Sequence, residues 1–252
     1  MKTVIKNCAT TLIILFVSLT QYKCNTNRQE SPIQQKLQLQ KVTSIKVAEP
    51  SGLTLSFDKN YFWCVGDSDS LVFKLDLNGN ILKTFLVNGE DLEGVTVVDS
   101  VHIAVVLERT REVVVLDTAG KEINRKKFDL KGRLNEGLEG ICYDSSKKEF
   151  YFINEKRPGL LIKTDSSFTE IFKRELKFAK DYSDLFFSHE DSSLWILSDE
   201  SNKIVKTDLN GNRILEYQIN VEQPEGLVVD YINKKVFIVS DKLNKLYEFI
   251  LP

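Results

Sequence analysis

Apolar and polar residues alternate over short stretches of this chain, and the alternation returns at regular intervals. Residues 53–57 alternate with the period of a β-strand. After a polar turn, the aromatic and β-branched run at 61–65 predicts a second strand. Residues 71–77 and 81–87 predict two more strands, and an Asn-Gly hairpin signal lies between them. This part of the chain therefore predicts four consecutive short strands.

The same pattern occurs five times, and each copy opens with an acidic or small residue. The openings are spaced 42, 46, 44 and 42 residues apart. A period in the forties with strand-like content is typical of a β-propeller, in which each repeat forms one four-stranded blade. The openings are Ser51-Gly52-Leu53, Glu93-Gly94-Val95, Glu139-Gly140-Ile141, Ser183-Asp184-Leu185 and Glu225-Gly226-Leu227.

The last copy ends at Pro252 without a fourth strand. A strand-like segment at 42–47 precedes the first copy, and we expect it to complete the last blade and close the ring. The sequence thus predicts an all-β fold, a β-propeller of five four-stranded blades closed by an N-terminal strand. The alternative is six blades, with a degenerate blade in the polar, Gln-rich residues 25–40.

The N-terminus has the pattern of a targeting segment. Lys2 and Lys6 precede an apolar stretch at 9–17, which is short for a membrane span of about 20 residues. A charged start and a short apolar run are typical of a secretory signal. We expect residues 1–23 to be a signal peptide or membrane anchor, 24–40 a polar tether and 41–252 the propeller domain.

Cys24 stands where a bacterial lipoprotein carries its lipidated cysteine, although Lys23 and Gln21 replace the small and aliphatic residues usual before it. Lipidation at Cys24, an uncleaved anchor and simple secretion therefore remain alternatives. All of them place the propeller outside the cytoplasm, and the expected location is the cell envelope, with attachment to the membrane. In the first two the partner is the membrane, reached through a lipid or the N-terminal segment.

Net charge bears on the possible partners, and cysteine content bears on disulfide bonds and the core. The chain carries 34 Lys and Arg against 36 Asp and Glu, a net charge of −2, so we expect no nucleic-acid partner, which calls for a basic face. The 4 cysteines do not form a disulfide framework. Cys64 and Cys142 fall within predicted strands, where we expect buried thiols that pack as small apolar residues.

Each copy has a second acidic residue 15 or 16 positions after its opening. In a propeller, the loop before the first strand and the loop between the second and third strands share one face. We therefore expect both sets of acids around one axial mouth. The predicted metal ligands are Glu93, Glu139 and Glu225. The predicted ligand-binding residues are Asp67, Glu108, Arg109, Glu155, Arg157, Asp199 and Asp241.

Converging carboxylates repel one another, so they either take up protons or are compensated by cations. An all-oxygen, flexible ligand set suits Ca²⁺ better than Mg²⁺, and Ca²⁺ is the expected cofactor. The alternative is a polar rim in which neighbouring Arg and Lys residues pair with the acids. His102 and His189 are expected on the opposite face, so a Ser-His-Asp hydrolase is not expected at the mouth.

Several short motifs lie in order across residues 48–250. Among them are Leu92-Glu93-Gly94-Val95, Leu107-Glu108-Arg109, Leu138-Glu139-Gly140-Ile141, Asn154-Glu155-Lys156-Arg157-Pro158, Ser198-Asp199-Glu200-Ser201 and Pro224-Glu225-Gly226-Leu227. In order and spacing they resemble the SdiA-regulated family, a bacterial group of envelope β-propellers related to NHL-repeat proteins. The resemblance implies a propeller held at the bacterial membrane. It implies no settled biochemical activity and no DNA binding.

Three functions are compatible with these patterns. The first is a non-catalytic envelope propeller that binds a ligand or an envelope protein at an acidic, Ca²⁺-occupied mouth. The second is a metal-dependent hydrolase, similar to lactonases or esterases, that uses the same acidic ring. The third is a passive scaffold in which the ring is structural.

Overall fold

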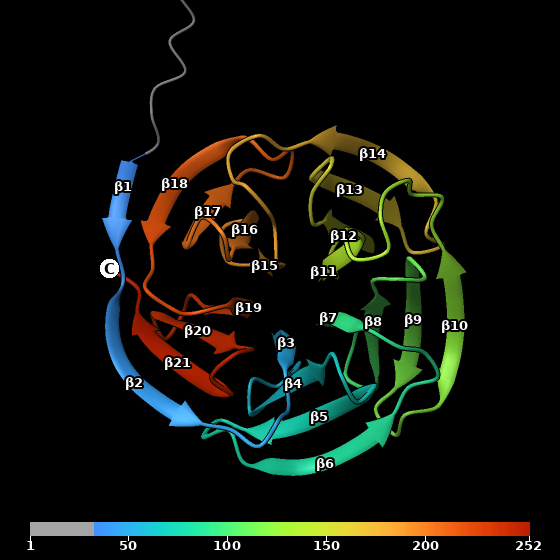
Figure 1. Ribbon diagram of the computed structural model, residues 1–252, viewed down its shortest axis with the longest axis horizontal. Coiled ribbons are helices and arrows are strands. Elements are labelled where there is room, and N and C mark those ends of the chain that lie inside the picture. Colours follow the sequence, from blue (N-terminus) through green and yellow to red (C-terminus); the bar gives the residue numbers. More distant parts are fainter. Residues whose placement is uncertain (1–32) are drawn as a thin grey trace, which may run out of the picture. The chain divides into compact units, whose positions relative to one another are not determined.

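The computed structural model describes residues 33–252, and its regular structure is entirely β (Figure 1). These residues form five sheets arranged in a ring, which confirms the five-bladed propeller and excludes the six-bladed alternative. Within the described range, no helix has the length and apolar character needed to cross a membrane.

Each blade runs from an inner strand at the axis to an outer strand at the circumference. Blade 1 consists of β3 (Pro50–Leu55), β4 (Tyr61–Gly66), β5 (Leu71–Asp76) and β6 (Ile81–Leu86). Blade 2 consists of β7 (Leu92–Val97), β8 (His102–Leu107), β9 (Glu112–Asp117) and β10 (Glu122–Lys127). Blade 3 consists of β11 (Leu138–Asp144), β12 (Glu149–Asn154), β13 (Leu160–Asp165) and β14 (Glu170–Glu175).

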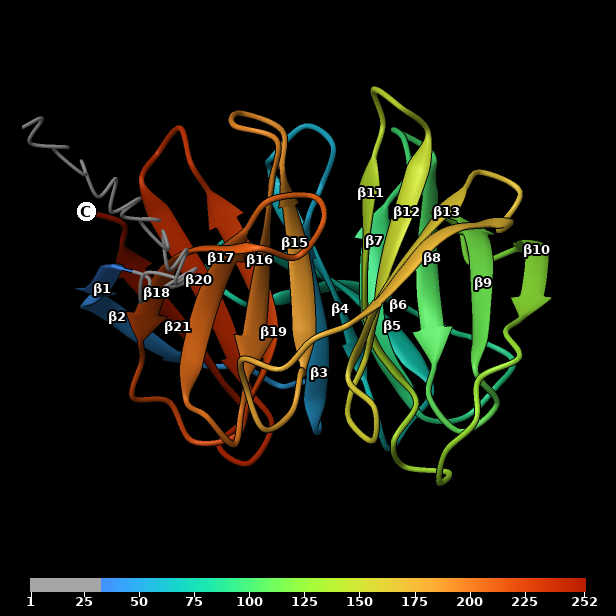
Figure 2. The same ribbon diagram turned by 90° about the horizontal axis from the view of Figure 1, so that it is seen from above.

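The last two blades incorporate the first described strands. Blade 4 consists of β15 (Asp184–Ser188), β16 (Ser193–Ser198), β17 (Lys203–Thr207), β18 (Arg213–Gln218) and β1 (Ile33–Lys36). Blade 5 consists of β19 (Pro224–Asp230), β20 (Lys235–Ser240), β21 (Lys245–Ile250) and β2 (Gln38–Ser44). In side view, the inner strands run alongside one another through the centre (Figure 2).

Ring closure occurs as expected, but its boundaries differ from the prediction. The closing strand β2 pairs antiparallel with β21 from Gln38 onward, not from residue 42. An outer strand is solvated on one face. The first half of β2 is therefore polar, and the search for apolar periodicity did not detect it. Ile45 and Val47, which had suggested the strand, are instead buried in the core just beyond its end. Strand β1 pairs parallel with β18, so ordered pairing begins within the stretch assigned to a tether.

Burial follows the order of strands within each blade. β16 is buried throughout, whereas β6 on the circumference is mostly exposed. Five apolar clusters fill the interfaces between neighbouring blades, and Trp63 and Trp195 are among the largest fully buried side chains. Cys64 and Cys142 are buried free thiols, as expected. Every blade packs face to face on two neighbours. The edges of the inner strands, which line the axis, are therefore shielded by the ring.

The turns between third and fourth strands repeat one hydrogen-bonding scheme. The Asp76 carboxylate accepts the backbone N–H groups of Asn78 and Asn80 at 2.8 and 2.9 Å. Gly79 adopts φ +83°, a conformation that glycine reaches without strain. The identical turn at 208–212 makes the same contacts at 2.9 and 2.8 Å. These local turns fix the hairpins independently of the axis.

Candidate functional site: the acidic mouth

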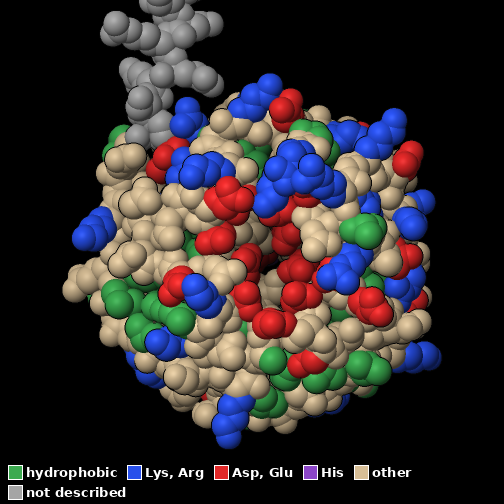
Figure 3. All heavy atoms as spheres, in the orientation of Figure 1, with side chains coloured by type: hydrophobic (Ala, Val, Ile, Leu, Met, Phe, Trp, Pro, Cys, Tyr) green, Lys and Arg blue, Asp and Glu red, His purple; other side chains and the backbone are tan. Residues whose placement is uncertain are grey.

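Acidic side chains surround one opening of the propeller axis (Figure 3). They come from the starts of inner strands and the ends of second strands, as the repeat predicts. The opening leads into a cavity of about 240 Å³, which we call the acidic mouth. Its lining contains a single basic residue, Lys156. The lining acids are Glu49, Asp67, Glu93, Glu108, Glu139, Glu155, Asp181, Asp199, Glu200, Glu225 and Asp241.

This lining contains all three residues predicted as metal ligands and five of the seven predicted to bind ligand. Arg109 and Arg157 do not line the cavity. Arg109 pairs with Asp91 at 3.0 Å, and Arg157 donates to Glu136 at 2.6 Å. Their side chains are 47% and 59% exposed, so both point outward. Cys24, the predicted lipidation site, lies outside the described residues.

Three acids at the mouth were missed by the sequence analysis. Glu49, Asp91 and Asp181 each stand two positions before the opening residue of a copy. The carbonyl of Glu49 accepts the N–H of Asp67 at 3.1 Å, and that of Asp91 accepts the N–H of Glu108 at 3.0 Å. Extending the repeat by two residues upstream would have found them.

Carboxylates gather in two groups of three. Within each group, one oxygen of every residue lies within 4.8 Å of the others. One group joins Asp67, Asp91 and Glu93, and the other joins Glu108, Glu139 and Glu155. Oxygen-rich clusters of this kind are the ligand sets of hard divalent cations.

The carboxylates nearest the axis are held in an unfavourable environment for charge. Burial, followed by the charges of Glu93 and Glu108, raises the pKa of Glu139 well above its usual value. Burial likewise raises the pKa of Glu93 and of Glu225. Burial, with a contribution from neighbouring acids, raises the pKa of Asp67 to about 6. Bound protons or a bound cation would therefore stabilise the ring.

Among the acids that line the mouth, only Glu155 and Glu200 pair with a basic residue of the described chain. Lys156 contacts Glu155 at 2.5 Å and Glu200 at 3.2 Å. In contrast, none of the inner glutamates Glu93, Glu139 and Glu225 pairs with a Lys or Arg of residues 33–252. The salt-bridged rim expected as an alternative is thus present only at the periphery.

Below the mouth the inner strands converge to a constriction, which we call the waist. A Cβ atom on Gly52 would lie 2.6 Å from the Glu93 carbonyl oxygen, and one on Gly94 2.7 Å from that of Glu139. Only glycine allows such an approach. In blade 4, Asp184 occupies the equivalent position and is buried.

The Asp184 carboxylate lies in the waist and bonds to the inner strands of two blades. It accepts the N–H groups of Leu185 and Leu227, both at 2.8 Å. Leu227 belongs to the neighbouring blade 5, so the contact ties two inner strands together at the axis. The Asp184 carboxylate also lies close to Gly140 of blade 3, because a Cβ atom on Gly140 would lie 2.8 Å from an Asp184 oxygen. Asp184 therefore fills the space between the mouth and the other end of the axis.

Comparisons with known proteins agree with this architecture. A family model described as SdiA-regulated matches residues 26–250. Among solved structures, virginiamycin B lyase from Staphylococcus aureus is 14% identical with a TM-score of 0.51, covering 81% of this chain. This chain spans 66% of that lyase, just under two thirds of its length. A streptogramin B lyase is 17% identical with a TM-score of 0.52, covering 84% of this chain and 72% of its own.

A structure of a nidogen/laminin complex is similar as well. It is 14% identical with a TM-score of 0.56, and the match covers 81% of this chain and 80% of that one. At these identities the similarity concerns the fold alone.

Proposed function

We propose that this chain, which belongs to the SdiA-regulated family, is a cation-dependent binding propeller of the cell envelope. The observation that carries the proposal is the inner ring of Glu93, Glu139 and Glu225, which has no basic partner among the described residues. Carboxylates that lose part of their hydration without compensation destabilise a fold unless protons or cations neutralise them. A resident cation would remove this cost.

The donor set indicates which cation fits. Carboxylate oxygens dominate the acidic mouth, and neither His nor Cys is among its lining residues. This disfavours Zn²⁺, which prefers nitrogen and sulfur ligands. Ca²⁺ accepts six to eight oxygens in flexible geometry, so it suits a ring whose members come from different blades. We propose that the inner ring of Glu93, Glu139 and Glu225 would hold it, with Glu108 and Glu155, whose oxygens cluster with that of Glu139, as further ligands.

A cation in the mouth would also shape recognition. Ca²⁺ seldom takes all its ligands from a few side chains, so positions remain for oxygens of a ligand or of a partner protein. The surrounding acids would then select partners with positive or hydrogen-bond-donating groups. This supports a binding role without requiring a nucleophile at the mouth.

Calcium titration by calorimetry tests the proposal. We expect the purified full chain to bind Ca²⁺ saturably and Glu139→Gln to bind at least tenfold more weakly. Glu170→Gln is the matched control, because Glu170 is exposed on outer strand β14, where it pairs with Lys173. No detectable calcium binding by the wild type would contradict the proposal. So would equal affinity in the Glu139→Gln variant.

The envelope location rests on the N-terminal sequence pattern. Cell fractionation of the full chain and of Cys24→Ser tests it. If Cys24 carries a lipid, the substitution moves the protein from the membrane fraction to the soluble envelope fraction. Membrane retention of the variant would favour an uncleaved anchor. A cytoplasmic wild type would contradict the envelope role.

The second candidate is a metal-dependent hydrolase of the lactonase or esterase kind on the same ring. It is favoured by the raised pKa of Glu139, since carboxyl groups that act as general acids or bases commonly have a pKa raised by their surroundings. Turnover of a lactone or ester panel that disappears with EDTA and in Glu139→Gln would support catalysis. Calcium binding without turnover would favour the binding function.

A further inference from the structure

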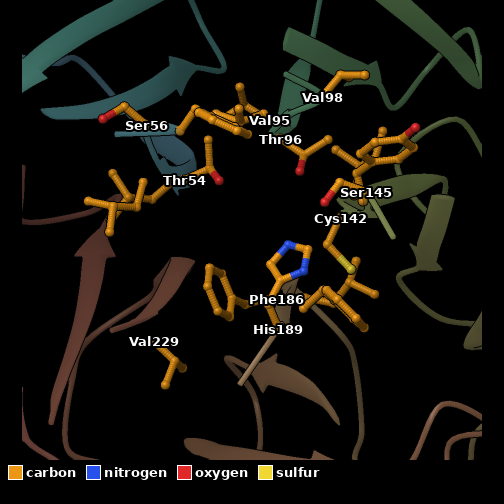
Figure 4. A pocket seen from close by; sticks show the side chains of 18 of the residues that line it. Thr54, Ser56, Val95, Thr96, Val98, Cys142, Ser145, Phe186, His189 and Val229 are labelled. Carbon is orange, nitrogen blue, oxygen red and sulfur yellow. The ribbon is translucent and has the colours of Figure 1, made fainter. Parts of the chain in front are cut away.

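The axis has a second cavity at its other end, on the side of the waist away from the acidic mouth (Figure 4). Its volume is about 220 Å³. We call it the axial pocket. No lining residue is shared between the two cavities. The axial pocket is therefore a separate site, and nothing in the proposed function uses it.

Strand alternation determines which side chains face this pocket. Residues two positions beyond the waist lie on the same face of each inner strand as the waist residues themselves. In blades 1 to 4 these are Thr54, Thr96, Cys142 and Phe186. Two neighbouring blades thus supply hydroxyl groups and the next two supply a thiol and a phenyl ring. Figure 4 shows Thr54 and Thr96 on one side of the pocket and Phe186 on the other.

Two hydroxyl groups of the pocket, those of Thr54 and Thr96, are available for a ligand. Thr54 and Thr96 are only 7% and 5% exposed, yet neither side chain hydrogen-bonds to another residue of the described chain. His189 stands at the entrance, where its ring packs edge-on against Phe187 with centroids 4.7 Å apart. That contact orients an imidazole with two ring nitrogens toward the pocket (Figure 4). A hydroxyl group that faces a cavity and makes no hydrogen bond within the described chain can bond to a ligand there.

The pocket carries no uncompensated charge from Lys, Arg, Asp or Glu. Only Lys59 and Glu190 of its lining are of these types, and they pair with each other at 3.1 Å. The pair joins blade 1 to blade 4 and balances to zero. Burial raises the pKa of Cys142 well above its usual value, so its thiol stays neutral. An ion entering this pocket would lose water without gaining a free counter-charge.

From this arrangement we infer that the axial pocket binds a small, uncharged, single-ring molecule bearing a hydroxyl or carbonyl oxygen. The ring packs against Phe186, and the oxygen bonds to the Thr54 and Thr96 hydroxyls. Size agrees, because an apolar cavity of about 150 Å³ accepts benzene, and the additional volume here accommodates a polar substituent. This specificity is opposite to that of the mouth, which is suited to cations.

Ligand-detected NMR titration of the purified full chain tests the inference, with phenol and benzyl alcohol as neutral probes and benzoate as the charged one. We expect both neutral probes to bind saturably and benzoate to bind at least tenfold more weakly. Phe186→Ala removes the stacking surface and weakens phenol about tenfold. Thr96→Val keeps the shape but removes one hydrogen bond, and it weakens phenol about fivefold.

Thr84→Val is the matched control, because Thr84 is exposed on outer strand β6 and should leave binding unchanged. Thermal melts confirm that each variant is folded, and Thr96→Val remains informative if Phe186→Ala unfolds. EDTA and Glu139→Gln should not alter phenol binding, which separates this test from that of the mouth. Absence of saturable binding by both neutral probes would overturn the inference. Unchanged phenol affinity in Thr96→Val and Phe186→Ala, or benzoate affinity equal to that of phenol, would overturn it too.

Discussion

The two ends of the axis are built from the same five inner strands and differ in how charge is balanced. At the acidic mouth, Glu93, Glu139 and Glu225 have no basic partner in the described chain. At the axial pocket, the charges of Lys59 and Glu190 cancel. Positions only three residues apart on a strand, such as Glu93 and Thr96, therefore belong to sites of opposite chemistry. The propeller backbone creates two cavities, and side-chain charge decides what each can hold.

The waist is the boundary on which this comparison depends, and changing it should have the largest effect. In Gly94→Ala, the new Cβ would lie 2.7 Å from the Glu139 carbonyl oxygen and 2.9 Å from the Gly140 Cα, so backbone must move. We expect a loss of about 3 kcal/mol, which lowers the Tm by roughly 6–12 °C in a domain of this size. Circular dichroism melts measure it. A Tm within two degrees of wild type would mean that the strands are not in contact there.

Removing one inner carboxylate should stabilise the metal-free protein. At pH 7.5 in EDTA, Glu139→Gln removes a carboxyl group whose ionisation is disfavoured by burial and by Glu93 and Glu108, so its Tm should exceed that of wild type by a few degrees. Glu170→Gln, on the exposed outer strand, should leave the Tm unchanged. A lower Tm in Glu139→Gln would show that this carboxylate is compensated in the absence of metal.

The same reasoning predicts how pH acts on the metal-free protein. Acids whose pKa is raised by folding bind more protons folded than unfolded, so stability falls as pH rises through that interval. For Asp67 the interval runs from its usual value of 3.8 to about 6. We expect the Tm in EDTA to decrease between pH 4 and 6.5, and Asp67→Asn to reduce the decrease. A Tm that rises across this range in wild type would contradict the assignment.

The smallest expected effect on stability comes from a substitution at the axial pocket. Glu190→Gln leaves Lys59 without its partner, and exposed ion pairs contribute less than about 1 kcal/mol, so stability should hardly change. Selectivity should change instead, because the free ammonium group gives benzoate a counter-charge. NMR titration should then show benzoate binding more tightly than to wild type, with phenol unaffected. Benzoate affinity that stays at the wild-type level would imply that Lys59 does not determine the charge preference.

The sequence predicted the blades and the mouth because both follow from a repeat. Strand alternation placed Glu93, Glu139 and Glu225 on one ring, and the strand-to-loop order placed the second acids beside them. It did not reveal β1, because a parallel outer strand of polar residues has no apolar period to detect. The sequence also did not show that the Arg109 and Arg157 side chains point outward. Their ion-pair partners are determined by the assembled blades.

The axial pocket was beyond sequence reasoning for a different reason. Thr54, Thr96, Cys142 and Phe186 occupy one repeat position, but they share no chemistry that would mark them as a set. Only their convergence at the axis gives them a common role. Acidic residues at the mouth do share a chemistry, which is why one end of the axis was recognisable and the other was not.

The central claim is that uncompensated charge at the mouth is satisfied by a cation. The most direct measurement is a thermal melt of the full chain in EDTA and in saturating Ca²⁺, beside a triple Glu93→Gln, Glu139→Gln, Glu225→Gln variant. Calcium at one hundred times its Kd adds about 2.7 kcal/mol, so we predict a rise of roughly 5–10 °C in wild type and little in the variant. An identical Tm with and without calcium in wild type, or an equal rise in the triple variant, would contradict the account.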